Sequence, residues 1–146
     1  MNMTPQEYQQ YVKQKAPKSP LLKDTVLAFV VGGAICVVGQ LILNGFTALD
    51  LSEQDAAAAT SVSLVFLSAV LTGLSVYDDI AKFAGAGTLV PITGFANAVV
   101  SPAIEFKAEG FVTGMAAKMF IIAGPVIVYG TVASVLYGLI LVIFGG

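Results

Sequence analysis

The residues best suited to chemistry gather in one apolar stretch, YDDIAKFAGAGTLVPITGFANAVVSPAIEFKAE, at positions 77–109. Acidic side chains flank it, with Asp78 on one side and Glu105 and Glu109 on the other. Between them, glycines and prolines that interrupt helices alternate with side chains that form hydrogen bonds. Interrupted backbone offers N–H groups to anions and carbonyl groups to cations, so the pattern is typical of a path for an ion or polar solute. The candidate pathway residues are Asp78, Gly85, Gly87, Pro91, Thr93, Gly94, Asn97, Glu105 and Glu109.

The same glycines and prolines have a second interpretation, in which they only permit close packing and sharp turns. The residues alone leave both interpretations open. Catalysis is poorly supported, because the chain has no histidine or arginine and the adjacent Asp78 and Asp79 would point about 100° apart on a helix. Gly85 and Gly87 also lack the lysine that follows the glycines of a nucleotide-binding loop. We therefore expect that the protein is not an enzyme, that it has no cofactor and no metal site, and that it has no nucleic-acid partner.

The composition places this stretch in an integral membrane protein. Of the 146 residues, 57% are hydrophobic and 11% are charged, whereas about 25% of a typical soluble domain is charged. With a mean hydropathy of +0.88, the chain has too little polar surface to cover a globule in water. The single cysteine, Cys36, excludes a disulfide framework within the chain.

Hydrophobic runs divided by polar or helix-breaking residues predict an all-α, polytopic membrane bundle with a discontinuous or re-entrant element. Polar residues 1–24 predict a cytoplasmic N-terminal segment with a short helix over 5–15, and residues 25–146 form the membrane domain. Lysines gather before the first apolar run, so that run should cross outward from the cytoplasmic side. The predicted membrane elements are spans over 25–43, 57–77 and 125–144, a broken element over 80–104, and a short helix over 110–123.

Small residues spaced by four predict contacts between helices, because they let two backbones approach closely. One such row lies in the first span and another in the last. The predicted helix-packing residues are Gly32, Cys36, Gln40, Gly130, Ser134 and Gly138.

Hydroxyl side chains share one face of the second span, and Asp79 extends that row if the helix persists to it. Such a row should avoid lipid, so it either joins two helices or forms the wall of a polar path. The lone Lys118 of the later apolar run should reach an interface or pair with a carboxylate of the central stretch. The hydroxyl residues of the row are Ser61, Ser68, Thr72 and Ser75.

The central motif also carries a family resemblance. The run YD, then FAGAG, then VPITGFAN, together with AFVVGGAICVVGQ at 28–40, resembles the SpoVAC/SpoVAEB membrane proteins of spore-forming Firmicutes. Of the two subunit types, AC and AE-B, the lysine-bearing lead YQQYVKQKAPKSP and the run EFKAEGFVTGMAAKMF favour the AC type. The resemblance extends over residues 7–144.

The resemblance implies a membrane subunit of a complex that imports dipicolinic acid with calcium into the forespore and releases it during germination. It implies a mechanosensitive, channel-like component of the spore inner membrane. Its implied partners are an AE-B-type membrane subunit and a thiolase-like AD subunit, in an oligomeric assembly. The alternative function is a non-conducting scaffold that assembles the pore-forming partner. The resemblance assigns no role to individual pathway residues.

Overall fold

The computed structural model describes residues 4–15 and 20–145, and every regular element within these residues is helical. Three stretches are long and apolar enough to cross a membrane: Leu21–Thr47, Glu53–Gly73 and Phe111–Phe144. The predicted all-α membrane fold is therefore confirmed. The elements are α1 (Pro5–Lys15), α2 (Leu21–Thr47), α3 (Glu53–Gly73), α4 (Val76–Ala84), η1 (Gly85–Thr88), α5 (Pro91–Glu105), η2 (Lys107–Glu109), η3 (Phe111–Ala116) and α6 (Ala117–Phe144).

The first helix, α1, forms where the sequence predicts a helix over 5–15. Pro5 occupies its first position, where the missing N–H leaves no hydrogen bond unmade. Thr4 Oγ1 accepts a hydrogen bond from the backbone N–H of Glu7 at 3.3 Å, and Glu7 Oε2 accepts one from the backbone N–H of Thr4 at 2.8 Å. This reciprocal cap fixes the start of the helix. Its hydrogen bonds to the Glu7 carboxylate lower the pKa of Glu7.

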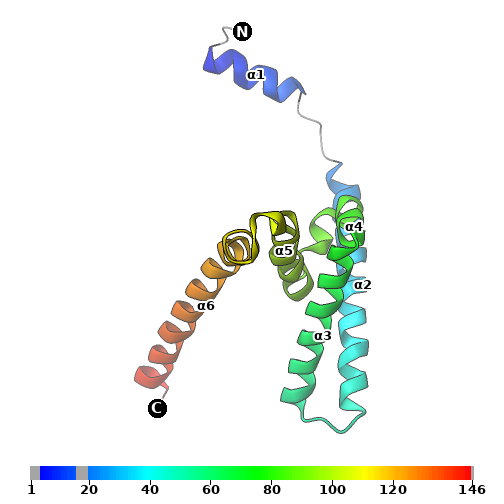
Figure 1. Cartoon of the computed structure of the whole chain (residues 1–146), viewed down its shortest axis with the longest axis vertical. Coiled ribbons are helices and arrows are strands. Elements are labelled where there is room, and N and C mark those ends of the chain that lie inside the picture. Colours follow the sequence, from blue (N-terminus) through cyan, green and yellow to red (C-terminus); the bar gives the residue numbers. More distant parts are fainter. Residues whose placement is uncertain (1–3, 16–19, 146) are drawn as a thin grey trace.

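Helices α2 and α3 lie side by side as an antiparallel hairpin (Figure 1). α2 is longer at both ends than the predicted span over 25–43. Its helical hydrogen bonds begin with Asp24 N to the carbonyl oxygen of Pro20 at 3.0 Å and continue to Ala48 N with the carbonyl oxygen of Asn44 at 2.9 Å. α3 begins directly after Ser52, whose Oγ accepts the backbone N–H of Asp55 at 3.2 Å. The buried residues of α3 recur every fourth position: Ala56, Thr60, Leu64, Ser68 and Thr72.

The second span ends earlier than its predicted limit at 77. α3 stops at Gly73, and Ser75 adopts a left-handed conformation with φ 61° that turns the chain into α4. The prediction that Asp79 extends the hydroxyl row is therefore wrong, because the helix does not persist to it. Asp79 instead lies on α4 and pairs with Lys82, its Oδ1 2.9 Å from the lysine Nζ.

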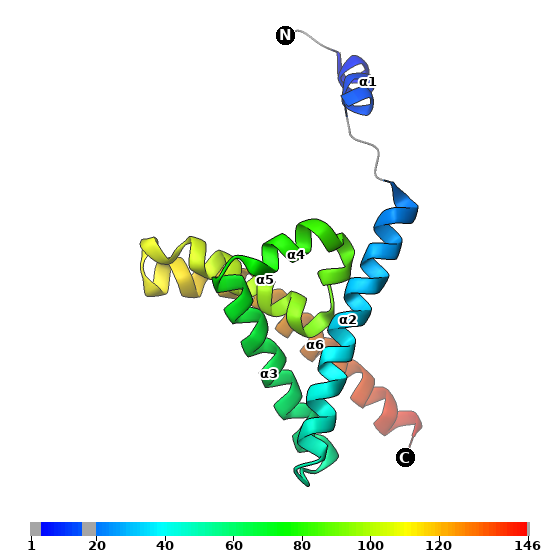
Figure 2. The same cartoon turned by 90° about the vertical axis from the view of Figure 1, so that its right-hand side faces the viewer.

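The broken element crosses the open end of the hairpin and returns (Figure 2). α4 passes from α3 to α2, η1 packs against α2, and α5 comes back to pack along α3. Val90 is extended, with φ −56° and ψ 127°, as expected before a proline, and Pro91 is the first residue of α5. The helix thus resumes at Pro91 rather than at the predicted position 95.

The last apolar run is one continuous helical stretch, Phe111–Phe144, which begins as the π-helical segment η3. The predicted division into a short helix over 110–123 and a span over 125–144 is therefore wrong. Pro125 lies inside α6 and removes one backbone donor, but the turns on both sides keep their hydrogen bonds because no water competes for them in a membrane. α6 packs against α5 and η3 at its start, and its far end diverges from the hairpin (Figure 1).

Candidate functional site

The site is built where the interruption of the broken element meets α2. A Cβ placed on Gly87 would lie 2.6 Å from the carbonyl oxygen of Ala28 and 2.8 Å from its Cα. A Cβ on Gly32 would lie 3.2 Å from the carbonyl oxygen of Gly87. Because the atoms in the way belong to the backbone, they cannot rotate aside, and only glycine fits at position 87. The interruption is thus pressed against α2 through backbone contacts.

A second close contact lies in the first turn of α5. A Cβ on Gly94 would lie 2.7 Å from the carbonyl oxygen of Thr88 and 3.2 Å from the Cα of Leu89. The first turn of α5 therefore folds directly onto the segment that precedes it. Gly85 has a different role, because it turns the chain out of α4 with φ 52° and is exposed, as is Pro91.

Two polar contacts, one helical turn apart, join α3 to α5. Ser68 Oγ donates a hydrogen bond to the carbonyl oxygen of Thr93 at 2.7 Å. Thr72 Oγ1 lies 2.8 Å from Asn97 Oδ1 and 2.7 Å from the carbonyl oxygen of Ser68. Ser68 and Thr72 are both buried in this contact. Of the two interpretations of the hydroxyl row, the structure therefore supports a helix contact for its middle members, in which Ser68 pairs with the Thr93 carbonyl oxygen and Thr72 pairs with Asn97.

Tyr77 holds the interruption from the side of α4. Its hydroxyl donates to the carbonyl oxygen of Thr88 at 2.9 Å, and Thr88 Oγ1 donates to the carbonyl oxygen of Gly85 at 3.0 Å. Both side chains are buried. These bonds satisfy backbone carbonyls that the interruption would otherwise leave without partners.

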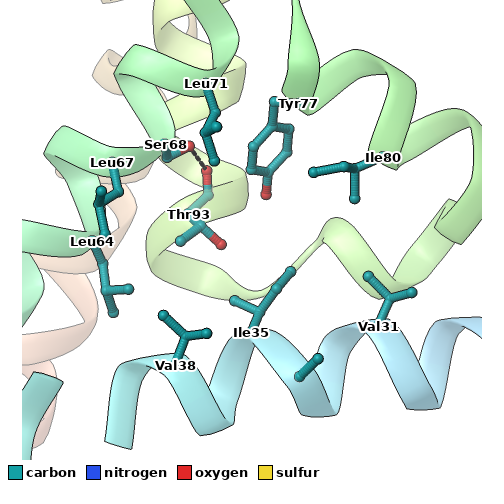
Figure 3. A pocket seen from close by; sticks show the side chains of 11 residues that line it. Val31, Ile35, Val38, Leu64, Leu67, Ser68, Leu71, Tyr77, Ile80 and Thr93 are labelled. Carbon is teal, nitrogen blue, oxygen red and sulfur yellow. Dashed lines mark hydrogen bonds between the residues drawn. The ribbon is translucent and has the colours of Figure 1, made fainter. Parts of the chain in front are cut away.

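A cavity of about 260 Å³ opens inside this arrangement, between α2, α3, α4 and the first turn of α5 (Figure 3). The accessible wall is entirely apolar, formed by aliphatic groups and the Tyr77 ring, and the hydroxyl groups of Ser68, Tyr77 and Thr93 do not reach its surface. Thr93 Oγ1 is buried and has no hydrogen-bond partner, while the carbonyl group of the same residue accepts the bond from Ser68. No ionisable side chain other than the Tyr77 phenol lines the cavity.

The carboxylates proposed for the pathway lie outside this cavity. Asp78, Glu105 and Glu109 are all exposed on the surface of the single chain. Lys118 does not pair with any of them, and its Nζ lies 3.8 Å from the centre of the Phe106 ring in a cation–π contact. The structure thus places Thr93 at the cavity and the three acids away from it.

Comparison with known proteins shows which family the chain belongs to. The model of the SpoVAC/SpoVAEB sporulation membrane proteins matches residues 24–140, from α2 through most of α6. The chain belongs to this family. Stage V sporulation protein AC of Bacillus subtilis (strain 168) is 46% identical over 136 residues, which cover 92% of this chain and 91% of that relative. No solved structure matches the chain.

The rows of small residues meet different surroundings in this SpoVAC/SpoVAEB family member. In the first row, Gly32 contacts Gly87, whereas Cys36 is exposed and Gln40 donates from Nε2 to Asn44 Oδ1 of its own helix at 2.8 Å. In the second row, a Cβ on Gly130 or Gly138 would meet no atom within 4 Å, and the Ser134 side chain is exposed. Within the described residues of one chain, the first row therefore makes a helix contact only at Gly32.

The sequence prediction of the site did not include Ala28, Tyr77 or Gly114. Ala28 lies four residues before Gly32, so the pair has the spacing of a small-residue contact and was detectable from the sequence. Tyr77 was visible only as part of the family motif, because an isolated tyrosine at a helix start gives no sign of a distant carbonyl partner. Gly114 also gives no sign of its partner in the sequence, since its packing against the carbonyl oxygen of Phe106 depends on how η2 and η3 turn.

Proposed function

We propose that this protein is a membrane subunit of the complex that moves dipicolinic acid, with calcium, into the forespore and releases it at germination. It acts in the spore inner membrane as a channel-like, mechanosensitive component, with its N-terminus in the cytoplasm. Its partners are an AE-B-type membrane subunit and a thiolase-like AD subunit. The resemblance to stage V sporulation protein AC supports the role in sporulation.

The observation that carries the proposal is the interrupted element α4–η1–α5 beside the two spans of the hairpin. A bilayer cannot hydrogen-bond exposed backbone, so such an interruption is tolerated only where protein or a water-filled path surrounds it. The contacts at Gly87, Gly94, Thr88 and Asn97 supply much of the protein surround. The path then runs beside this element, along the pathway residues proposed above.

The conducting path does not run through the cavity of a single chain. Dipicolinate is a dianion, and a wholly apolar wall would leave its charge unpaired, at a cost of many kcal/mol. Asp78, Glu105 and Glu109 face outward instead, where a carboxylate must meet water or another protein surface rather than lipid. The path therefore forms between the broken element of this chain and a neighbouring subunit, with these acids attracting the calcium ion.

Opening requires the broken element to move. Two polar contacts hold α5 to α3, and interhelical hydrogen bonds in membranes contribute only about 0.6 kcal/mol each on average. Bilayer tension favours any state with a larger cross-section, so separation of α5 from α3 is the movement that tension would drive. The contact between Gly87 and α2 then stays in place while α5 moves.

The test uses spores that carry conservative changes of the exposed acids. Asp78→Asn, Glu105→Gln and Glu109→Gln should each slow the release of dipicolinate and calcium, because each removes one charge without changing shape. Glu53→Gln, at the exposed start of α3, is the matched control and should release at the normal rate. Normal uptake and release in all three pathway variants would show that the acids do not line the path.

The alternative is a non-conducting scaffold, which the exposed second row of small residues on α6 would suit as a surface for the pore-forming partner. Purified chain alone in liposomes distinguishes the two. A tension-activated current supports the channel. If only the co-expressed complex moves dipicolinate, and cysteines placed at 85–97 never react with water-soluble reagents, the scaffold function is correct.

A further inference from the structure

The course of the broken element shows which side of the membrane its charged residues face. Helix α5 runs parallel to α3, because residues further along α5 meet residues further along α3. The pairs, in chain order along both helices, are Ser68 with Thr93, Thr72 with Asn97, and Gly73 with the Ile104 side chain. The end of α5 therefore lies beside the end of α3. In the antiparallel hairpin this is also the end at which α2 begins, and we name the membrane surface there the N-terminal side.

The turn of the element at η1 stays close to the N-terminal side. Its backbone meets α2 at Ala28 and Gly32. The uncharged part of α2 starts at Thr25, so at 1.5 Å per residue these contacts lie about 5 and 10 Å along it, whereas the hydrocarbon core is about 30 Å thick. α4 and α5, with 9 and 15 residues, are also shorter than the roughly 20 residues that a crossing requires. The element therefore enters the membrane without crossing it.

The last helical stretch then crosses in the same direction as α2. Phe111–Phe144 has 34 residues, more than one crossing requires, and its start packs against α5. Figures 1 and 2 both show the far end of α6 near the level of the turn between α2 and α3, away from α4. Within residues 20–145 this course gives three crossings, so the start of α2 and the end of α6 lie on opposite sides.

The distribution of lysines supports this course independently of the helix contacts. Short segments on the cytoplasmic side of membrane proteins are enriched in lysine and arginine. The lysines of the sequence, which has no arginine, are Lys13, Lys15, Lys18, Lys23, Lys82, Lys107 and Lys118. If the broken element enters and leaves on one side, all of them fall on the N-terminal side by their place in the chain. If the element crossed, Lys107 and Lys118 would lie on the other side.

We propose that α4–η1–α5 is a re-entrant loop that enters and leaves the membrane on the N-terminal side, and that α6 ends on the opposite side. Asp78 on α4, Glu105 at the end of α5 and Glu109 on η2 then all face the N-terminal side. The interrupted part of the path consequently opens to that side alone, and a cation reaches these acids only from there. This consequence for the path rests on the proposed function, whereas the course of the chain does not.

Single cysteines at exposed positions of the full chain test this course. Intact bacterial cells and inverted membrane vesicles that contain each variant are treated with a membrane-impermeant maleimide. Lys82→Cys and Lys107→Cys flank the broken element, and Lys15→Cys marks the N-terminal side. We expect these three to be labelled in inverted vesicles and to lose all labelling in intact cells. Gln54→Cys at the start of α3 and Phe144→Cys at the end of α6 should show the reverse.

All variants carry Cys36→Ala, and the chain with this change alone is the unlabelled control. The proposal is wrong if Lys82→Cys and Lys107→Cys are labelled from opposite sides, because the broken element then crosses. It is also wrong if Phe144→Cys is labelled from the same side as Lys15→Cys. If all five positions exchange sides together, the loop still re-enters, and only the cytoplasmic N-terminus of the proposed function is wrong. None of these results depends on whether the protein conducts dipicolinate.

Discussion

The broken element and α6 contain the same kinds of residue but are surrounded very differently. The broken element is apolar with glycines and hydroxyl groups, and it is fixed to α2 by Gly87 and to α3 by Ser68 and Thr72. α6 is apolar with a row of glycines and a serine, yet none of its residues is buried. Glycines and hydroxyl residues therefore mark internal contacts in one region and an uncovered surface in the other.

The difference shows what stabilises each region. The hydrophobic effect does not favour contact between helices inside a bilayer, so the broken element relies on close packing and hydrogen bonds. α6 needs neither, because a continuous apolar helix satisfies its own backbone and is soluble in lipid as it is. Stability in this protein should therefore depend on a few specific contacts in the broken element and very little on side chains of α6.

The largest contrast should come from alanine at two glycines. Gly87→Ala places a Cβ against the backbone of Ala28 and should lower the free energy of unfolding by about 1–3 kcal/mol, the usual cost of overpacking. Gly130→Ala meets no atom within 4 Å and should leave that free energy unchanged or raise it by about 0.5–1 kcal/mol, since alanine favours helix. Unfolding by SDS in mixed micelles measures both.

Opposite signs for the two glycines would support the comparison. If Gly130→Ala destabilises the protein as much as Gly87→Ala does, α6 is packed against a partner in the micelle and the comparison fails.

A smaller effect is expected from the contacts between α3 and α5. A double-mutant cycle with Thr72→Val and Asn97→Ala should give a coupling free energy of about 0.6 kcal/mol, and at most about 1.7 kcal/mol, as for other interhelical hydrogen bonds in membranes. Ser134→Ala, on the exposed face of α6, should cost nothing measurable. A coupling free energy of zero would mean that the contact contributes no stability to the broken element.

The smallest effect should lie at the junction of the two regions. Lys118 is the single lysine of the Phe111–Phe144 stretch, and its contact with the Phe106 ring joins α6 to the end of α5. A cycle with Lys118→Met and Phe106→Leu should give a coupling of about 0.5 kcal/mol. Should Lys118→Met alone cost several kcal/mol, the lysine has a buried carboxylate partner in the assembled protein and the junction extends beyond one chain.

Much of the fold could be predicted because long apolar runs identify membrane helices directly. The interruption was also predictable, since Gly85, Gly87 and Pro91 lie close together in the sequence and each disfavours a continuous helix. The helix limits near Ser75 and Pro125 could not be predicted from the sequence. A left-handed serine has no clear sequence signal, and a proline inside a membrane helix is tolerated because the surrounding hydrogen bonds have no competitor.

The site was predictable in its residues but not in their partners. Thr72 was recognised as part of a hydroxyl row that should avoid lipid, and Asn97 as a candidate pathway residue, yet nothing in the sequence pairs two side chains 25 positions apart. Which face of α3 meets α5 depends on the turn at Ser75 and the return at η1. The unpartnered hydroxyl of Thr93 likewise emerges only when three helices and a turn enclose it.

The central claim is that α5 must separate from α3 for the protein to conduct, and a disulfide across that contact tests it most directly. Cysteines replace Thr72 and Asn97 in a chain whose exposed Cys36 is changed to alanine, and tension-activated current is recorded from liposomes. We expect no current while the disulfide is intact and normal current after reduction, with each single-cysteine variant unaffected by oxidant. A full current through the oxidised protein would contradict the account.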